Sequence, residues 1–227
     1  MSERLPDDDE HDEQELAQRV IALTLARMIG IKEIDPSKIK SKKRFRQVID
    51  QLGRTEENAF EIHINHLPAR INSIRVTLES GDPQSAIVLL HTLIESEVNT
   101  VVRLFLRVRG FSNAAITTAI AGIDLKSKLD VLLPVLGIEV GARIRQLASE
   151  SQKIRNAIVH FKAGPTLSSD LGDIAGDHEA SQIRASEFFG RNTVTAIEKE
   201  LEWFVDGCGS QCPEIRAAHA LFQRFSA

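Results

Sequence analysis

The sequence predicts an all-α protein, in which an antiparallel bundle of four or five helices is preceded by additional N-terminal helices. Three observations predict this class. Apolar residues recur every three or four positions along most of the chain, glycines and prolines fall between these periodic segments, and the alternation of a half-buried strand is not sustained. The composition, with 42% hydrophobic and 26% charged residues, is ordinary for a globular protein.

The N-terminal third is expected to hold an acidic tail followed by helices. Residues 1–15 carry eight acidic residues and one basic residue, a composition that favours disorder. The expected segments after the tail are a helix ended by Gly30 (16–29), a basic segment opened by the cap Asp35 and the first-turn Pro36 (36–53), and a helix kinked by Pro68 (57–80).

The remaining segments are expected to form the bundle and a last helix. In chain order they are a long helix ended by Gly110 (83–109), a short helix (113–121), a helix between Asp124 and Gly137 (125–136), a motif helix (139–162), a loop rich in Gly, Ser and Asp (164–180), a helix with the single Trp (186–206), and a helix after Pro213. The expected divisions are the tail (1–15), an N-terminal helical region (16–69), the bundle (70–206) and a C-terminal helix (207–227).

The motif helix is predicted to turn one face to the bundle. At about 100° per residue, its apolar positions cluster within roughly 100° of one another. These positions are Ile144, Leu147, Ser151, Ile154, Ile158 and Phe161. From the centre of that face, Asn156 and His160 lie about 170° and 150° away, and Arg155 about 70° away. Asn156 and His160 are therefore expected to face outward in a monomer.

Glu97 falls within the apolar stripe of the long helix, where a carboxylate is costly unless it gains a partner. We predict that Arg155, at the edge of the neighbouring face, pairs with it. The alternative is that Glu97 lies near the rim of the bundle and reaches water.

The motif R-N-A-I-V-H, from Arg155 to His160, resembles the signature of the HEPN superfamily. Its context is similar too, since a long helix containing LLHTLIESEVN and a helix containing DLKSKLDVL precede SQKIRNAIVHF. The resemblance covers roughly residues 70–206. It implies a metal-independent endoribonuclease that needs no cofactor, acts as a homodimer and cuts single-stranded RNA, as toxins or antiviral effectors of this superfamily do, and it allows for an antitoxin or regulatory protein as a partner.

The resemblance also implies roles for individual residues. His160 would be the general acid or base, Arg155 would stabilise the charge on the phosphoryl oxygens, and Asn156 would orient either group. Lys162 stands where some HEPN toxins carry a tyrosine that is modified, and the chain has no Tyr, so silencing through that tyrosine is excluded. Lys162 is a candidate substrate-binding residue that would contact a phosphate, or a solvated lysine at the helix end.

Two other interpretations stay open. The chain could be a HEPN-fold module that binds a nucleotide or a partner without turnover, which the net charge of −4 and the few aromatics favour. More faintly, it is similar to helical regulators of the mannitol-repressor type, which share a long helix followed by a DLxxxLxxL helix but lack the RN…H signature.

The remaining signals concern compartment, metal and charge. Two cysteines and an acidic N-terminus without an apolar signal-peptide core favour a cytoplasmic protein with no membrane segment. Cys208 and Cys212, with His219 beyond them, do not have the spacing of a zinc site, so no metal is expected. Residues 36–46 hold six basic residues and no acid, which indicates either a solvated helix face or a groove for an RNA backbone.

Overall fold

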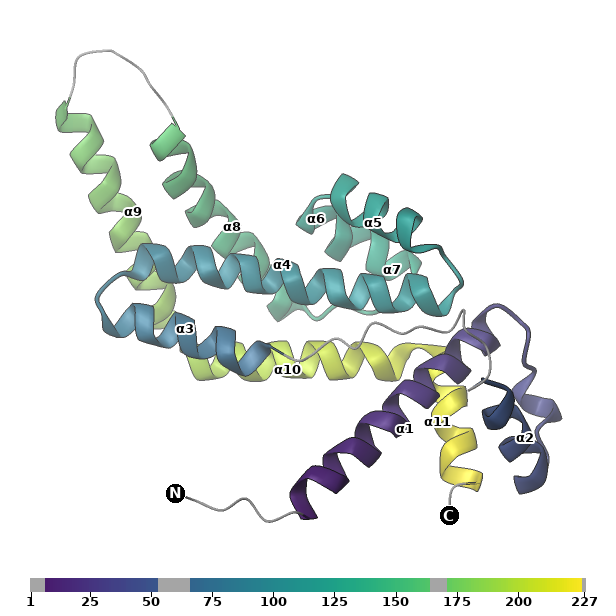
Figure 1. Cartoon of the computed structure of the whole chain (residues 1–227). Helices are drawn as coiled ribbons and strands as arrows, with labels where there is room; N and C mark the ends of the chain where they lie inside the picture. Colours follow the sequence, from purple (N-terminus) through teal and green to yellow (C-terminus); the bar gives the residue numbers. More distant parts are fainter. Residues whose placement is uncertain (1–6, 53–65, 164–170, 226–227) are drawn as a thin grey trace. The chain divides into compact units, whose positions relative to one another are not determined.

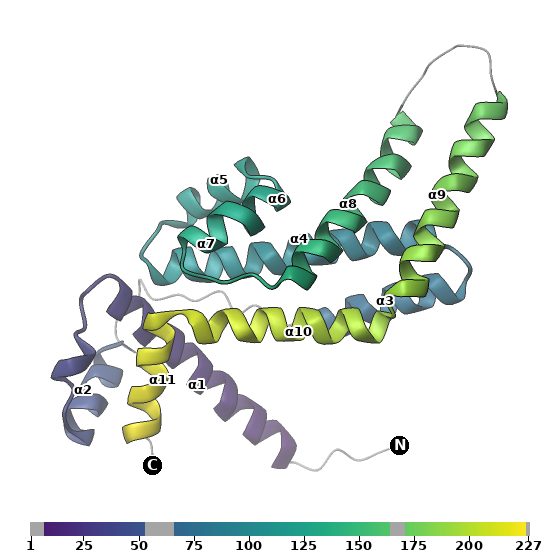
Figure 2. The same ribbon diagram turned by 180° about the vertical axis from the view of Figure 1, so that it is seen from behind.

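The computed structural model describes the backbone of residues 7–52, 66–163 and 171–225, and the side chains of 18–52, 66–159 and 179–225. This described backbone consists of helices and their connections, with no strand in it (Figures 1 and 2). The predicted all-α class is therefore confirmed.

The chain forms two compact units. The first contains Met1–Ile64, Arg103–Ile120 and Gly209–Ala227, and the second contains Asn65–Val102 and Ala121–Cys208. Residues 103–120 thus group with the two ends of the chain, although they lie within the stretch 70–206 that the sequence assigns to the bundle. The reason is the length of the helix Pro83–Val108, which has 26 residues and spans about 39 Å. Its residues up to Val102 belong to the second unit, and its residues from Arg103 belong to the first.

The first unit is built around two helices near the ends of the chain. Its elements are α1 (Asp7–Gly30), the 3₁₀ turn η1 (Pro36–Lys38), α2 (Lys42–Leu52), most of α5 (Asn113–Gly122) and α11 (Pro213–Phe225). α1 packs against α11, and Phe45 of α2 contacts the rings of Phe222 and Phe225 at centroid distances of 5.2 and 5.6 Å. A Cβ at Gly30 would collide with the carbonyl oxygen of Val108, so only glycine allows this close approach.

Three expectations for the N-terminal third need correction. α1 begins at Asp7, so the backbone of residues 7–15 is helical where the sequence favoured disorder. Asp35 caps only η1, and α2 begins later, at Lys42. α3 (Leu67–Glu79) places Pro68 in its first turn, where proline is tolerated, so no kink results. The earlier part of the helix expected over 57–80 lies outside the described residues.

The second unit contains α3, α4 (Pro83–Val108, up to Val102) and the elements from Ala121 to Cys208. These are α6 (Leu125–Ser127), a π-helical turn (Lys128–Leu132), α7 (Leu133–Val135), α8 (Ala142–Ala163), α9 (Leu171–Arg191) and α10 (Val194–Gln211). α3, α4 and α10 lie side by side, while α8 and α9 form a pair that projects from them (Figures 1 and 2). By length and composition α4 could cross a membrane, but half of that stretch is buried in the protein, and a core helix meets the same criteria.

The break between α9 and α10 was not predicted. α9 begins within the segment expected to be a loop (164–180), and the helix expected over 186–206 is interrupted at Asn192 and Thr193. Asn192 is 4% exposed, and its Nδ2 donates to the carbonyl oxygen of Phe188 (2.8 Å), which satisfies a helix-end acceptor. The Oγ1 of Thr193 accepts from the backbone N–H of Ala196 (3.3 Å), as an N-cap does.

Candidate functional site

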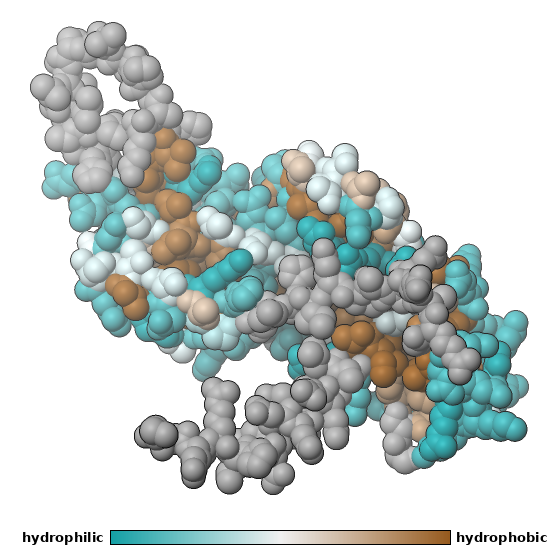
Figure 3. Space-filling view, viewed as in Figure 1, coloured by the Kyte–Doolittle hydropathy of each residue, from teal (hydrophilic) through white to brown (hydrophobic). Residues whose placement is uncertain are grey.

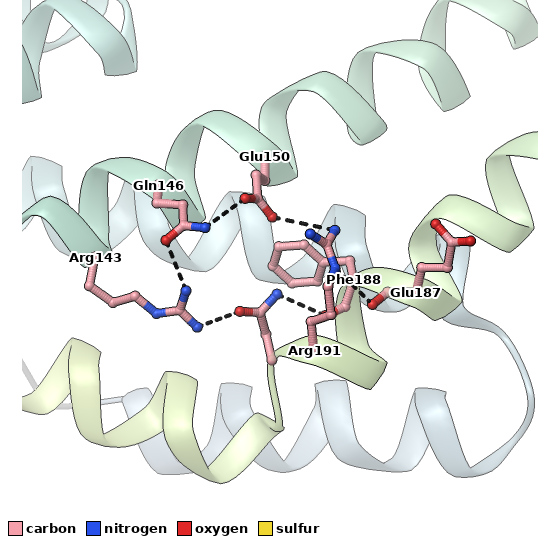
Figure 4. A network of polar contacts seen from close by, with 7 residues as sticks. Arg143, Gln146, Glu150, Glu187, Phe188 and Arg191 are labelled. Atoms are coloured by element: carbon pink, nitrogen blue, oxygen red, sulfur yellow. Dashed lines mark hydrogen bonds and ion pairs between the residues drawn. The ribbon is translucent and has the colours of Figure 1, made fainter.

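The motif lies in the C-terminal half of α8, whose N-terminal half is fixed to the α9–α10 break. Figure 4 shows this network. Arg143 donates to Asn192 Oδ1 and, at 3.0 Å, to Gln146 Oε1. Gln146 Nε2 donates in turn to Glu150 Oε1 (2.8 Å), and Glu150 Oε2 lies 3.7 Å from Arg191 Nη2. Because these contacts hold the first two turns, the motif is presented by an anchored helix.

The predicted bundle-facing side of α8 is largely confirmed. The buried positions are Ile144, Leu147, Ser151 and Ile158, whereas Ile154 is half-buried and the side chain of Phe161 lies outside the described residues. Ala148 is buried as well, which widens the buried side toward the position of Arg155.

Arg155 and Asn156 form a contact of their own. Both are half-buried, and Arg155 Nη1 donates to Asn156 Oδ1 (3.1 Å). Asn156 is thus less exposed than the helical wheel predicted. α8 continues without interruption to Ala163, so His160 and Lys162 belong to the same helix, although their side chains lie outside the described residues.

The predicted pairing of Glu97 with Arg155 is wrong. Burial raises the pKa of the Glu97 carboxyl, and the cation that opposes this shift is Arg70 of α3. Arg70 also donates through Nη1 to Ser96 Oγ (2.6 Å). The electrostatic influence of Arg155 falls instead on His91, which lies about 120° around α4 from Glu97.

A line of polar residues on α4, missed in the sequence, lies beside α8 and the turn after α6. His91, Glu95 and Asn99 recur every four residues and so share one side of α4. We call them the polar line. His91 is 7% exposed, and its Nδ1 lies 3.2 Å from Ser151 Oγ, while Asn99 Oδ1 accepts a hydrogen bond from Lys128 Nζ (2.8 Å). The sequence signal for this line was the recurrence of a polar residue at every fourth position in LLHTLIESEVN.

The hydrogen bonds favour one tautomer of His91. Ser151 Oγ lies 3.1 Å from the carbonyl oxygen of Ala148, an acceptor for its single hydroxyl proton. In that arrangement His91 Nδ1 donates to Ser151 Oγ, and its Nε2 is left as an acceptor. Burial lowers the pKa of His91, the charge of Arg155 lowers it further, and Glu95 opposes both. His91 is consequently neutral near pH 7.

This lowered pKa predicts acid sensitivity of the fold. An unfolded histidine takes up its proton near pH 6.5, whereas folded His91 does so only at lower pH. The contribution of neutral His91 to the stability of the fold is therefore complete above about pH 6.5 and is lost as the pH falls below it. We expect His91→Gln to weaken this acid loss, measured as the thermal midpoint between about pH 7.5 and pH 5. His219, which is exposed, supplies the matched control as His219→Gln. Equal slopes for wild type and His91→Gln would contradict the assignment.

A cavity of about 700 Å³ opens beside the motif end of α8. It is lined by Gly81, Asp82, Gln84, Ser85, Val88, Leu89, Ile158, Val159 and Gln182. In Figure 3 hydrophobic side chains (brown) gather in a band over this part of the molecule. The volume is within the usual range for small-ligand sites. Asp82 is its one charged group among the described residues, so its described lining offers no cation to a phosphate.

The described residues contain no group of three or more His, Cys, Asp or Glu that could hold a metal ion. Cys208 and Cys212 are both buried free thiols. Burial raises the pKa of Cys208 to about 12 and that of Cys212 to about 11, and Cys212 Sγ donates to Glu214 Oε2 (3.0 Å). Both thiols are therefore protonated near pH 7.

Comparison of the chain with protein-family models, with curated proteins and with solved structures finds no match. The functional assignment therefore depends on the residues that α8 and α4 bring together.

Proposed function

We propose that the chain is a metal-independent endoribonuclease of the HEPN type that cuts single-stranded RNA in a toxin or phage-defence system. One observation carries the proposal. Arg155 and Asn156 are joined by a hydrogen bond, are only half-buried, and stand on a helix that continues unbroken through His160. A guanidinium, an amide and an imidazole on one anchored helix can supply the charge stabilisation and the proton transfer that phosphodiester cleavage through the ribose 2′-hydroxyl needs.

In this reaction each group has a distinct task. His160 moves the proton of the 2′-hydroxyl or of the leaving 5′-oxygen, because imidazole is the side chain best suited to general acid–base work near neutrality. Arg155 stabilises the charge that develops on the phosphoryl oxygens, because its planar fork donates two parallel hydrogen bonds. Asn156 holds that fork in place through Oδ1. The products are a 2′,3′-cyclic phosphate and a 5′-hydroxyl.

The helix geometry favours a site made by two copies of the chain. His160 follows Arg155 by five positions, so the two lie about 140° apart around α8. One helix therefore presents them to different sides, whereas a two-fold axis would bring the Arg155 of one copy to the His160 of the other.

Cleavage of a single-stranded RNA by the purified protein in the presence of EDTA tests the proposal. Wild type is expected to cut, leaving cyclic phosphate ends, and His160→Ala to lose at least about a hundredfold in rate, because that is the usual contribution of general acid–base catalysis. The exposed His219 gives the matched control, and His219→Ala should cut as wild type does. Equal cutting by all three proteins would mean that the activity is a contaminant.

The cavity beside α8 favours a second candidate, a non-catalytic module that binds a small ligand. Its volume suits a nucleoside-sized molecule, and its Asp82, Gln84 and Gln182 side chains could hydrogen-bond to a base. Under this alternative, RNA is not cut by any variant, and Gln182→Ala weakens ligand binding measured by thermal stabilisation.

A further inference from the structure

The strongest local concentration of positive charge in the first unit lies on and just before α2. The exposed cations there are Lys38, Lys40, Lys42, Lys43, Arg44 and Arg46, which we call the basic surface. The segment from Pro36 to Gln47 contains no acidic residue. In Figure 3 the region around α2 is hydrophilic (teal).

Most of these charges are not used within the fold. Lys38 lies 3.8 Å from Asp35, and Arg44 Nη1 donates to the neutral Gln47 Oε1 (3.3 Å), which leaves the charge of Arg44 uncompensated. Among the described residues no ion pair involves Lys40, Lys43 or Arg46. Asp50, the one acid of α2, follows Arg46 by four residues without pairing with it.

The position of the cations on α2 opposes helix stability. Lys42, Lys43 and Arg44 occupy the first turn, which holds no acidic residue. The N-terminus of a helix is already the positive end of its dipole, so cations there are unfavourable in the free protein. The same arrangement adds the helix potential to that of the side chains and attracts an anion. The charge pattern is therefore explained by a ligand better than by folding.

The packing of α2 narrows the choice of ligand. Its apolar residues Phe45, Val48 and Leu52 are buried, with Phe45 against the rings of α11. A helix that binds a membrane surface keeps its apolar side free to enter the lipid, and α2 does not. From the buried Phe45, Arg46 and Lys43 lie about 100° and 160° around the helix, on its solvent side. The solvent side of α2 is therefore polar and carries several positive charges, which are complementary to the negative charges of a phosphate backbone.

We propose that the basic surface binds the phosphate backbone of single-stranded RNA and so provides a docking site separate from Arg155, Asn156 and His160. The choice of RNA among polyanions rests on the proposed function. Such contacts are independent of sequence, and each phosphate neutralised adds about 0.7 to the slope of log affinity against log salt for a single strand.

The test uses full-length protein carrying His160→Ala, so that RNA is bound and not cut. Lys40→Gln/Lys43→Gln is compared with Lys126→Gln/Lys199→Gln, which removes the same charge from exposed lysines of the second unit. Binding of a labelled single-stranded RNA is measured by fluorescence anisotropy between about 50 and 200 mM salt. We expect Lys40→Gln/Lys43→Gln to lose roughly tenfold or more in affinity at low salt. The slope of log affinity against log salt should fall in magnitude by about 1.4, because two phosphate contacts are lost. The control should match its parent in RNA binding, and neither double variant should have a lower thermal midpoint than its parent, because Lys43→Gln removes a cation from the positive end of α2.

Equal affinity and slope for the two double variants would overturn the proposal, as would an absence of RNA binding at low salt. Tighter binding of a poly-glutamate peptide than of RNA, lost in Lys40→Gln/Lys43→Gln, would overturn it in favour of an acidic protein partner. Failure of the ribonuclease assignment is separable, because it would appear as RNA bound by the basic surface and left uncut by the protein with His160 intact.

Discussion

Arg155→Ala is expected to reduce RNA cleavage by about a hundredfold or more while leaving the helices intact. The reason is that electrostatic stabilisation of the phosphoryl oxygens is commonly the largest catalytic contribution of a single group. Arg155→Lys keeps the charge and loses the planar fork, so we expect it to recover little of the rate. Rates are measured on one labelled RNA with EDTA present, beside circular dichroism spectra of each protein.

Arg145 gives a matched control on the same helix. It is exposed, and its Nε lies 3.7 Å from Asp130 Oδ1 in a surface ion pair of little energetic value. Arg145→Ala should therefore cut as wild type does. Undiminished cutting by folded Arg155→Ala would contradict the assigned role, and the hydrogen bond to Asn156 would then be a structural contact only.

The same variants distinguish a site shared by two copies from a site within one copy. If Arg155 of one copy serves His160 of the other, mixing Arg155→Ala with His160→Ala restores activity, since half of the dimers are mixed and one of their two sites is intact. The expected recovery is about one quarter of the wild-type rate. A site within one copy predicts no recovery.

The sequence predicted the helices well because their periodicity and punctuation are local. The cap at Asp124 and the left-handed glycines Gly110 and Gly137 stand where the helix ends were expected. Some errors came from interactions between segments. The break at Asn192 has a local signal, the cap at Thr193 and the contact of Asn192 with Phe188, which the sequence analysis missed. The hydrogen bond from Arg143, which is distant in the chain, could not be read from residues 186–206.

The candidate site was predictable only in part, for the same reason. The motif identified Arg155 and Asn156, but a helical wheel has no information about which neighbouring helix faces which side. Glu97 was accordingly assigned to the wrong cation, and the contact between His91 and Ser151 was not anticipated. The repeat of His91, Glu95 and Asn99 at every fourth position was visible, and it indicated a polar side of α4 without naming its partners.

Asn99→Leu is expected to destabilise the second unit by about 2 kcal/mol, because hydrogen bonds to charged groups contribute about that much. Lys128 is 1% exposed, and its ammonium donates to Asn99 Oδ1 at 2.8 Å, so Leu would leave a charged donor without this acceptor. The measurement is urea unfolding at pH 7. Gln47→Leu, which removes an exposed amide that accepts from Arg44, should change stability by less than about 0.5 kcal/mol.

The double variant Asn99→Leu/Lys128→Met separates a lost hydrogen bond from a poorly fitting leucine. If the stranded ammonium is the cause, replacing it with a neutral side chain of similar length restores most of the stability, since a buried polar pair can often be exchanged for apolar groups at little cost.

The dependence of stability on pH in the alkaline range tests the same hydrogen bond independently. Burial lowers the pKa of Lys128 below its ordinary 10.5, so the unfolded chain holds the proton more tightly and stability rises with pH in the alkaline range. Asn99 accepts a hydrogen bond from the charged ammonium of Lys128, so its loss should lower the pKa of Lys128 further. The rise of stability with pH should therefore become steeper in Asn99→Leu, and it should disappear in the double variant, which has no ammonium at this position. An Asn99→Leu protein with the alkaline profile of wild type would show that Asn99 does not hold the charge of Lys128, and Glu95 would then be the group that does.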